Sequence, residues 1–207
     1  MSVPAAPEPR AIGTNTLALC VQALRRGEPI IVPTDTVYGL AARASDTDAI
    51  ARIFELKQRP ADRSLAVLVA DIAQADELAI VDGRSRRLMQ AFWPGALTVV
   101  VTRRPSMLDN LGAADGTIGL RSPAHGFVRT LAGEVGPIAA TSANRHGEPT
   151  PSDATGVADV FGADGVVVVD GGVLGGDAST VVDARESELI VHRPGPISAD
   201  DLNDALR

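Results

Sequence analysis

Apolar residues recur three or four positions apart in several stretches of the chain, which predicts amphipathic helices. In residues 15–26 this spacing is carried by Leu17, Cys20, Val21 and Leu24. Asn15 or Thr16 would cap that helix, and Gly27 would end it. The same reasoning predicts further helices over residues 47–57, 85–92, 127–132, 153–161 and 199–206, with Ser198 capping the last.

Short apolar runs between turn residues separate these helices and predict strands. The runs cover residues 29–33, 65–70, 97–102, 117–121, 137–140, 166–169, 180–183 and 189–192. Alternating helices and strands are typical of an α/β fold. The last three strands are close enough in sequence to form antiparallel pairs, so we expect a mixed sheet flanked by helices.

The chain has 207 residues, of which 45% are hydrophobic and 22% charged, and this composition favours one ordinary globular domain. We expect a flexible tail over residues 1–13 and a single domain over 14–207. The start has neither the basic nor the apolar segment of a leader, and no run is long enough to span a membrane, so a cytoplasmic location is expected. The single cysteine, Cys20, cannot form an internal disulfide.

The formal net charge of −7 argues against a protein that mainly grips long nucleic acid by its phosphates. A local cationic pocket is still compatible with it. Lys57, the single lysine among 19 basic residues, is followed closely by Arg59 and Arg63. Together they suit an anion, although basic residues at a helix end also simply complement its dipole. Helical spacing puts Lys57 on the inward face, where we expect it to emerge at the rim of the core.

Polar side chains follow three predicted strands, at the strand ends where open α/β sheets bind ligands. Residues 141–144, Thr-Ser-Ala-Asn, come after one strand, while Arg121 and Arg193 end two others. The glycine-rich stretch 171–176 lacks the lysine and following helix of a P-loop, so it is either a flexible connection or backbone left bare for a ligand. The three histidines are far apart and show no metal-binding spacing.

Six segments taken together resemble the YrdC-like threonylcarbamoyl-adenylate synthase family and occur in that family's order. They are Pro-Thr-Asp-Thr-Val-Tyr-Gly-Leu at 33–40, Lys-Gln-Arg-Pro at 57–60, Trp-Pro-Gly-Ala-Leu-Thr at 93–98, Ser-Ala-Asn at 142–144, Ser-Thr-Val-Val-Asp at 179–183 and Arg-Pro-Gly at 193–195. They span nearly the whole chain. The pairing of Lys-x-Arg with a distant Ser-x-Asn is much more specific than any single segment.

The resemblance implies a twisted open α/β sheet around a concave, positively charged cavity. Residues implied to contact ATP are Lys57, Arg59, Arg63, Thr117, Ser142, Asn144, Thr150 and Arg193, and the reaction would depend on Lys57, Arg59, Ser142 and Asn144. Residues implied to surround L-threonine are Thr36, Arg121, Ala140 through its backbone, and Ser179. Where longer members place a histidine against threonine, this chain has Leu68.

The implied reaction joins L-threonine, bicarbonate and ATP into threonylcarbamoyl-adenylate and pyrophosphate. The product would pass to a complex that modifies tRNA. Mg²⁺ would accompany the triphosphate, held mainly by phosphates and water, since no carboxylate cluster indicates a protein metal site. Two alternatives stay open: a double-stranded RNA-binding module, which the net charge disfavours, and a carbamoyl-adenylate synthase that uses carbamoyl phosphate.

Overall fold

A computed structural model describes residues 8–58, 64–105, 108, 110–112 and 115–207. The helices are α1 (Thr14–Arg25), α2 (Thr47–Lys57), α3 (Ile72–Leu78), α4 (Gly83–Phe92), α5 (Gly126–Val135), α6 (Ala154–Phe161) and α7 (Ala199–Asp204). A short 3-10 turn, Gly162–Asp164, follows α6. In the described part of the chain no helix is long and apolar enough to cross a membrane.

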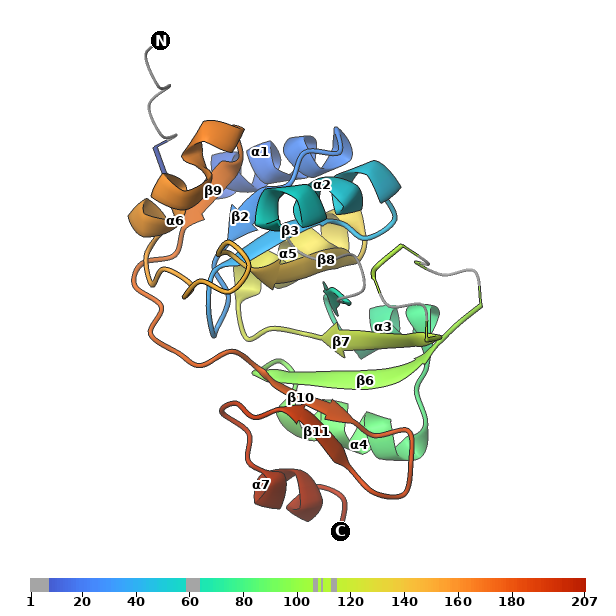
Figure 1. The fold of residues 1–207 in the computed structure, drawn as a ribbon. Helices are drawn as coiled ribbons and strands as arrows, with labels where there is room; N and C mark the ends of the chain where they lie inside the picture. The colour runs from blue at the N-terminus through green and yellow to red at the C-terminus, as the bar shows by residue number, and fades with distance from the viewer. Residues whose placement is uncertain (1–7, 59–63, 106–107, 109, 113–114) are drawn as a thin grey trace.

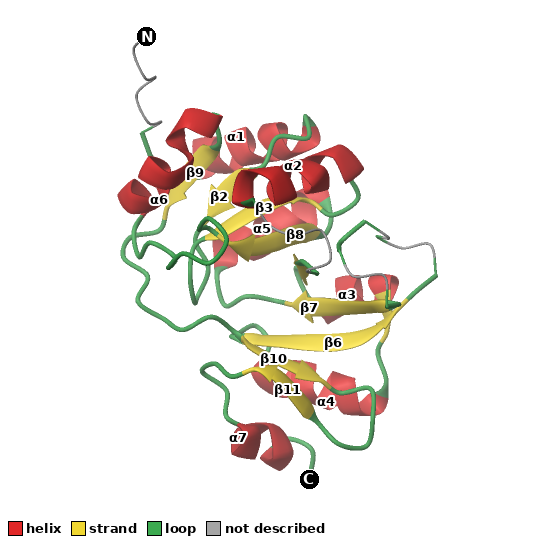
Figure 2. Ribbon diagram, viewed as in Figure 1, coloured by secondary structure: helices red, strands yellow, loops and turns green. Residues whose placement is uncertain are grey.

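The strands form one mixed sheet flanked by helices (Figure 2). They are β1 (Arg10–Ala11), β2 (Ile30–Val32), β3 (Gly39–Arg43), β4 (Ala66–Leu68), β5 (Ala79–Ile80), β6 (Leu97–Arg103), β7 (Thr117–Arg121), β8 (Ile138–Ser142), β9 (Val167–Asp170), β10 (Thr180–Asp183) and β11 (Ile190–Arg193). Their order is β1-β9-β2-β3-β8-β4-β7-β6-β10-β11, with β5 added beside β6. The α/β class and the mixed sheet predicted from the sequence are confirmed.

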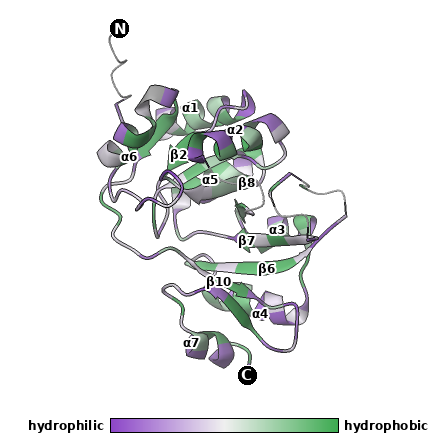
Figure 3. Cartoon of the chain, in the orientation of Figure 1, coloured by the Kyte–Doolittle hydropathy of each residue, from purple (hydrophilic) through white to green (hydrophobic). Residues whose placement is uncertain are grey.

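Helices cover both faces of the upper part of the sheet in Figure 1, with α2 and α6 in front and α1 and α5 behind. Helices α1 and α5 share one buried cluster with β2, β3 and β8. A larger cluster joins α2, α4, α6 and α7 to the strands. Figure 3 shows the matching pattern, in which the strands carry mostly hydrophobic residues and the outer turns of the helices hydrophilic ones.

Four helices begin at an aspartate whose carboxylate accepts a backbone N–H of the first turn, which is the expected chemistry of a helix start. These caps are Asp46, Asp71, Asp82 and Asp153. Ser198 caps α7 in a capping box, as predicted. The predicted cap of the first helix is wrong, because α1 begins after Gly13, which has no side chain to accept that bond.

The structure also adds elements that periodicity does not predict: β1, β3, α3 and β5. Residues 10 and 11 lie within the predicted tail but pair with β9 in parallel, while residues 1–7 lie outside the described part of the chain. Strand β8 runs on to Ser142, so Thr141 and Ser142 belong to the strand rather than to a turn after it. The first of the last three predicted strands, β9, pairs with β1 and β2, whereas β10 and β11 form the expected antiparallel pair.

Candidate functional site

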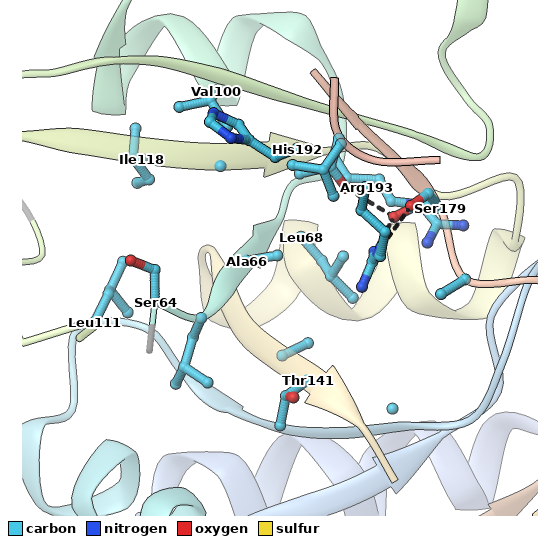
Figure 4. A pocket seen from close by; sticks show the side chains of 18 of the residues that line it. Ser64, Ala66, Leu68, Val100, Leu111, Ile118, Thr141, Ser179, His192 and Arg193 are labelled. Atoms are coloured by element: carbon cyan, nitrogen blue, oxygen red, sulfur yellow. Dashed lines mark hydrogen bonds between the residues drawn. The ribbon is translucent and has the colours of Figure 1, made fainter. Parts of the chain in front are cut away.

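A cavity of about 450 Å³ opens over the middle of the sheet and is lined by β4, β6, β7, β8 and β10 (Figure 4). Small residues form its floor, because Ala66 pairs with Gly119 on one side and with Ala140 on the other. Residues directly opposite each other on neighbouring strands face the same side of the sheet, so these three form one row. The cavity exists because that row carries no bulky side chain.

Arg121, the last residue of β7, occupies one end of the cavity and is only 5% exposed. Its Nε donates to the carbonyl of Gly95 at 3.0 Å, its Nη1 to Thr36 Oγ1 at 3.0 Å, and its Nη2 to Asp35 Oδ1 at 2.6 Å. Burial lowers the pKa of the guanidinium, and the charge of Asp35 opposes that shift. Arg121 is therefore a fixed cation inside the cavity.

The turn after β2 fixes the hydroxyl groups beside Arg121. Thr34 Oγ1 accepts the backbone N–H groups of Thr36 and Val37 at 3.1 and 3.2 Å, and donates to the carbonyl of Val37 at 2.7 Å. Short polar side chains commonly close turns in this way. Thr36 is 2% exposed and lines the cavity, so the turn presents its hydroxyl to a ligand there.

Ser179 completes this end of the cavity from the segment that precedes β10. Its hydroxyl lies 2.9 Å from Thr98 Oγ1 and accepts from Arg193 Nη2 at 3.0 Å, and its carbonyl accepts from Arg193 Nε at 2.9 Å. Figure 4 shows the side chain of Arg193 reaching across to Ser179. Burial lowers the pKa of Arg193. Gly195 packs so closely that a Cβ atom there would lie 2.4 Å from the Ala178 carbonyl, which explains the glycine of the Arg-Pro-Gly segment.

The opposite end of the cavity carries hydroxyl groups and two carboxylates. Thr117 Oγ1 donates to Asp115 Oδ1 at 2.6 Å, and Ser142 ends β8 on the neighbouring side. Asp183 forms an ion pair with Arg185 at 2.8 Å, and the hydrogen bond from Arg185 is the main reason that the pKa of Asp183 is lowered. Both carboxylates are thus already engaged by neighbouring donors.

Lys57 lies in the core rather than at its rim, with 1% of its surface exposed, so the expected rim position is wrong. Its ammonium group donates to the carbonyls of Ser142 at 2.6 Å and Asn144 at 2.7 Å. Asn144 Oδ1 in turn accepts from Thr150 Oγ1 at 3.1 Å. These four residues form one hydrogen-bonded polar group, in which Lys57 and Asn144 are buried and Ser142 belongs to the cavity lining.

Seven of the residues predicted from the resemblance line the cavity together: Thr36, Thr117, Arg121, Ala140, Ser142, Ser179 and Arg193. Lys57, Asn144 and Thr150 do not line it but are connected to Ser142 by the hydrogen bonds above. Arg59 and Arg63 lie outside the described residues. Leu68 is 4% exposed and lines the cavity beside Arg121.

Asp35 and Thr98 are among the polar residues of this site that were not predicted. Both lie inside segments that carry the family resemblance, which was the available signal. Their roles come from contacts with Arg121 and Ser179, partners more than 80 residues away in the chain. The described lining also includes four arginines, two aspartates and one histidine: Arg103, Arg121, Arg185, Arg193, Asp115, Asp183 and His192.

The fold and the cavity define an α/β protein with a polar small-molecule pocket on an open mixed sheet. A family profile, Sua5_yciO_yrdC, described as "Telomere recombination", matches residues 22–195, and the chain belongs to this family.

A Mycobacterium tuberculosis relative, provisionally named as a threonylcarbamoyl-AMP synthase, is 40% identical over 203 residues, which cover 97% of this chain and 92% of the relative. The threonylcarbamoyl-AMP synthase of Bacillus subtilis is 39% identical over 194 residues, 92% of this chain and 56% of that protein. The crystal structure of Pyrococcus abyssi Sua5 complexed with L-threonine superposes with a TM-score of 0.90 at 32% identity, covering 96% of this chain and 60% of that one.

Proposed function

We propose that this protein is an L-threonylcarbamoyladenylate synthase, an enzyme that forms threonylcarbamoyl-AMP and pyrophosphate from L-threonine, bicarbonate and ATP. The observation that carries the proposal is the gathering of Thr36, Thr117, Arg121, Ser142 and Ser179, which come from distant parts of the chain, in the lining of a single cavity. A volume of about 450 Å³ falls within the usual range of small-molecule sites. Named relatives at 39 to 40% identity support the same activity.

The amino acid occupies the Arg121 end in this proposal. Arg121 pairs with the carboxylate of threonine, and Thr36, Ser179 and the backbone of Ala140 complete that subsite. Guanidinium groups bind carboxylates through two parallel hydrogen bonds, which fixes orientation as well as position. The superposition on a relative complexed with L-threonine supports a threonine site in this fold.

The nucleotide occupies the part of the cavity lined by Thr117 and Ser142, and Arg193, held at Ser179, is a further proposed nucleotide contact. Thr117 and Arg121 lie on the same face of β7, four residues apart, so the two subsites are separated by about 13 Å along the strand. Lys57, Asn144 and Thr150 support this end from behind through Ser142. Arg59 and Arg63 are further proposed phosphate contacts.

The chemistry requires alignment and charge compensation more than a protein nucleophile. The neutral amine of threonine forms a C–N bond with bicarbonate as a C–O bond breaks and water leaves, or with carbon dioxide as the amine loses a proton to solvent, and either route gives an N-carboxylate. An oxygen of that carboxylate then bonds to the α-phosphorus of ATP as the bond to the leaving pyrophosphate breaks. Both reactants are anionic, so fixed cations offset their repulsion and the cavity aligns the attack. On this basis the protein is a nucleotidyltransferase.

Magnesium would enter with ATP as part of the substrate. Among the described residues no group of three or more histidine, cysteine, aspartate or glutamate side chains is arranged to hold a metal ion. The two carboxylates of the cavity, Asp115 and Asp183, are bonded to Thr117 and Arg185. In this proposal the phosphates of ATP and water hold most of the magnesium coordination.

We further propose that the protein acts in the cytoplasm, that its product passes to a complex which transfers the threonylcarbamoyl group to tRNA, and that the protein itself binds RNA weakly or not at all. The net charge of −7 supports the last point, because binding to nucleic acid depends mainly on phosphate contacts.

A substrate panel tests the function. Pyrophosphate release from ATP is measured with bicarbonate, with and without L-threonine, and with L-serine or carbamoyl phosphate in its place. We expect release that requires both threonine and bicarbonate. Release driven by carbamoyl phosphate would instead assign a carbamoyl-adenylate synthase, and no release with any of them would remove the synthase function.

A further inference from the structure

Asp35 belongs to the Pro-Thr-Asp-Thr segment but does not line the cavity, although Thr34 and Thr36 on either side of it do. Its carboxylate faces Arg121 instead, with Oδ1 2.6 Å from Nη2. The side chain of Arg121 is 7% exposed and that of Asp35 15%, although Asp35 as a whole residue is exposed. The contact that links the Asp35 carboxylate to the site is therefore the one with Arg121.

A guanidinium group has five N–H donors in one rigid plane. In Arg121, three of these N–H groups donate to described acceptors. The acceptors are the carbonyl of Gly95 and the side chains of Asp35 and Thr36, which share one turn. One N–H on each terminal nitrogen then remains for a ligand. Because Arg121 lines the cavity, these two N–H groups are the ones that a bound carboxylate can accept from.

Among the three acceptors, only Asp35 carries a charge. Hydrogen bonds between ions are about twice as strong as those between neutral groups, so Asp35 dominates the orientation of the plane. The hydroxyl of Thr36 is neutral and also lies 3.0 Å from Thr34 Oγ1. A buried guanidinium with no counter-ion would be costly in the empty site, and Asp35 supplies that counter-ion before substrate arrives.

We propose that Asp35 is a positioning residue. It holds Arg121, before substrate arrives, in the orientation in which two of its N–H groups form a bidentate pair of hydrogen bonds with the carboxylate of the amino-acid substrate. The proposal rests on the proposed function, in which that substrate is threonine. Asp35 thereby governs the affinity for the amino acid and has little influence on the affinity for ATP or on the chemical step.

Two substitutions separate the effect of the negative charge of Asp35 from the effect of its acceptor oxygen. Asp35→Ala removes the acceptor, whereas Asp35→Asn keeps an oxygen in nearly the same place. Asp76→Asn is the matched control, because Asp76 pairs with Arg86 at the same 2.6 Å but each of those side chains is 39% exposed and neither lines the cavity. Initial rates give KM for threonine, KM for ATP and kcat for each protein, and thermal unfolding is followed in parallel.

For Asp35→Ala we expect KM for threonine to rise about tenfold or more, while KM for ATP stays within about twofold. Asp35→Asn, which keeps an acceptor oxygen but not the charge, should recover only part of the loss, and Asp76→Asn should match the wild type. An unchanged KM for threonine in Asp35→Ala would overturn the proposal. So would a parallel rise of both KM values with a fall in unfolding temperature, since that pattern indicates general damage to the fold.

A second measurement is independent of turnover. If Arg121 is held at three points, rotation about its Nε–Cζ and Cζ–Nη bonds is hindered, and ¹⁵N NMR should show separate signals for its two Nη nitrogens. Their absence in Arg121→Lys would assign them. In Asp35→Ala we expect the two signals to merge, and in Asp76→Asn to persist. Separate signals that survive in Asp35→Ala would overturn the positioning role, whereas a wild type without threonine-dependent turnover would contradict only the proposed function.

Discussion

The sequence identifies Lys57 as a candidate site residue, but it does not predict which groups surround its ammonium group. Its place in a Lys-x-Arg segment singles it out, and helical spacing gives its inward direction. Spacing does not reveal that the ammonium group ends on the carbonyls of Ser142 and Asn144, more than 80 residues further along the chain. Because its ammonium group holds the carbonyl of Ser142, which lines the cavity, Lys57 has a part in shaping that cavity.

Removing that ammonium group should affect both stability and activity. In Lys57→Met the stem of the side chain is kept but two buried carbonyls lose their donor, so we expect the free energy of unfolding to fall by about 2 kcal/mol. Turnover should fall at least about a hundredfold, because the Ser142 to Asn144 segment loses its support and the phosphates lose a cation. Urea unfolding and pyrophosphate release measure the two effects.

Arg52→Met is the matched control for that variant, since Arg52 lies on the exposed side of the same helix. It should leave both quantities unchanged. A folded Lys57→Met protein with wild-type turnover would remove Lys57 from the mechanism.

At the scale of the elements, the connection from β9 to β10 matters for the site because its last residues, Ala178 and Ser179, line the cavity. These strands are second and ninth in the sheet order, so residues 171–179 cross from one end of the sheet to the other, as Figure 1 shows. Tyr38 braces the start of this connection: its hydroxyl donates to the carbonyl of Gly172 at 2.8 Å and accepts from the N–H of Gly171 at 3.0 Å. Ser179 anchors the other end beside Arg193.

The hydroxyl of Tyr38 should therefore control the mobility of this connection. In Tyr38→Phe we expect faster amide hydrogen exchange in residues 171–176 and a loss of about 1–2 kcal/mol in the free energy of unfolding, because two backbone groups lose their partner. Gln74→Met also removes two side-chain bonds to backbone groups, the N–H of Ala70 and the carbonyl of Ala132, neither of which belongs to or pairs with this connection, and should leave exchange there unchanged. Equal exchange in Tyr38→Phe and wild type would contradict the bracing role.

Elements with strong periodicity, such as α2 and β7, are predicted well from the sequence, and the missed ones have a common physical reason. Strand β3 reads Gly-Leu-Ala-Ala-Arg, and glycine and alanine have low strand propensity. It forms because β2 and β8 pair with it on both sides. Helix α3 is only seven residues long, too short for its spacing to stand out. In both cases tertiary contacts, rather than the local sequence pattern, determine which secondary structure forms.

At the scale of the whole molecule, the sequence predicts the class of fold but not the order of its strands. Parallel pairs such as β4 with β7 and β6 with β10 join segments tens of residues apart, and nothing in their local pattern specifies those partners. The row of Ala66, Gly119 and Ala140 that opens the cavity depends on this order. Seven residues of the cavity lining could still be named in advance, because the resemblance supplied them.

The central claim is that this cavity unites threonine, bicarbonate and ATP, and the most direct test follows the carbon of bicarbonate. The protein is incubated with ¹³C-bicarbonate, ATP and L-threonine, and the products are resolved by mass spectrometry. The account predicts threonylcarbamoyl-AMP carrying one ¹³C atom, formed only when all three substrates are present. ATP turnover without labelled threonylcarbamoyl-AMP would contradict it.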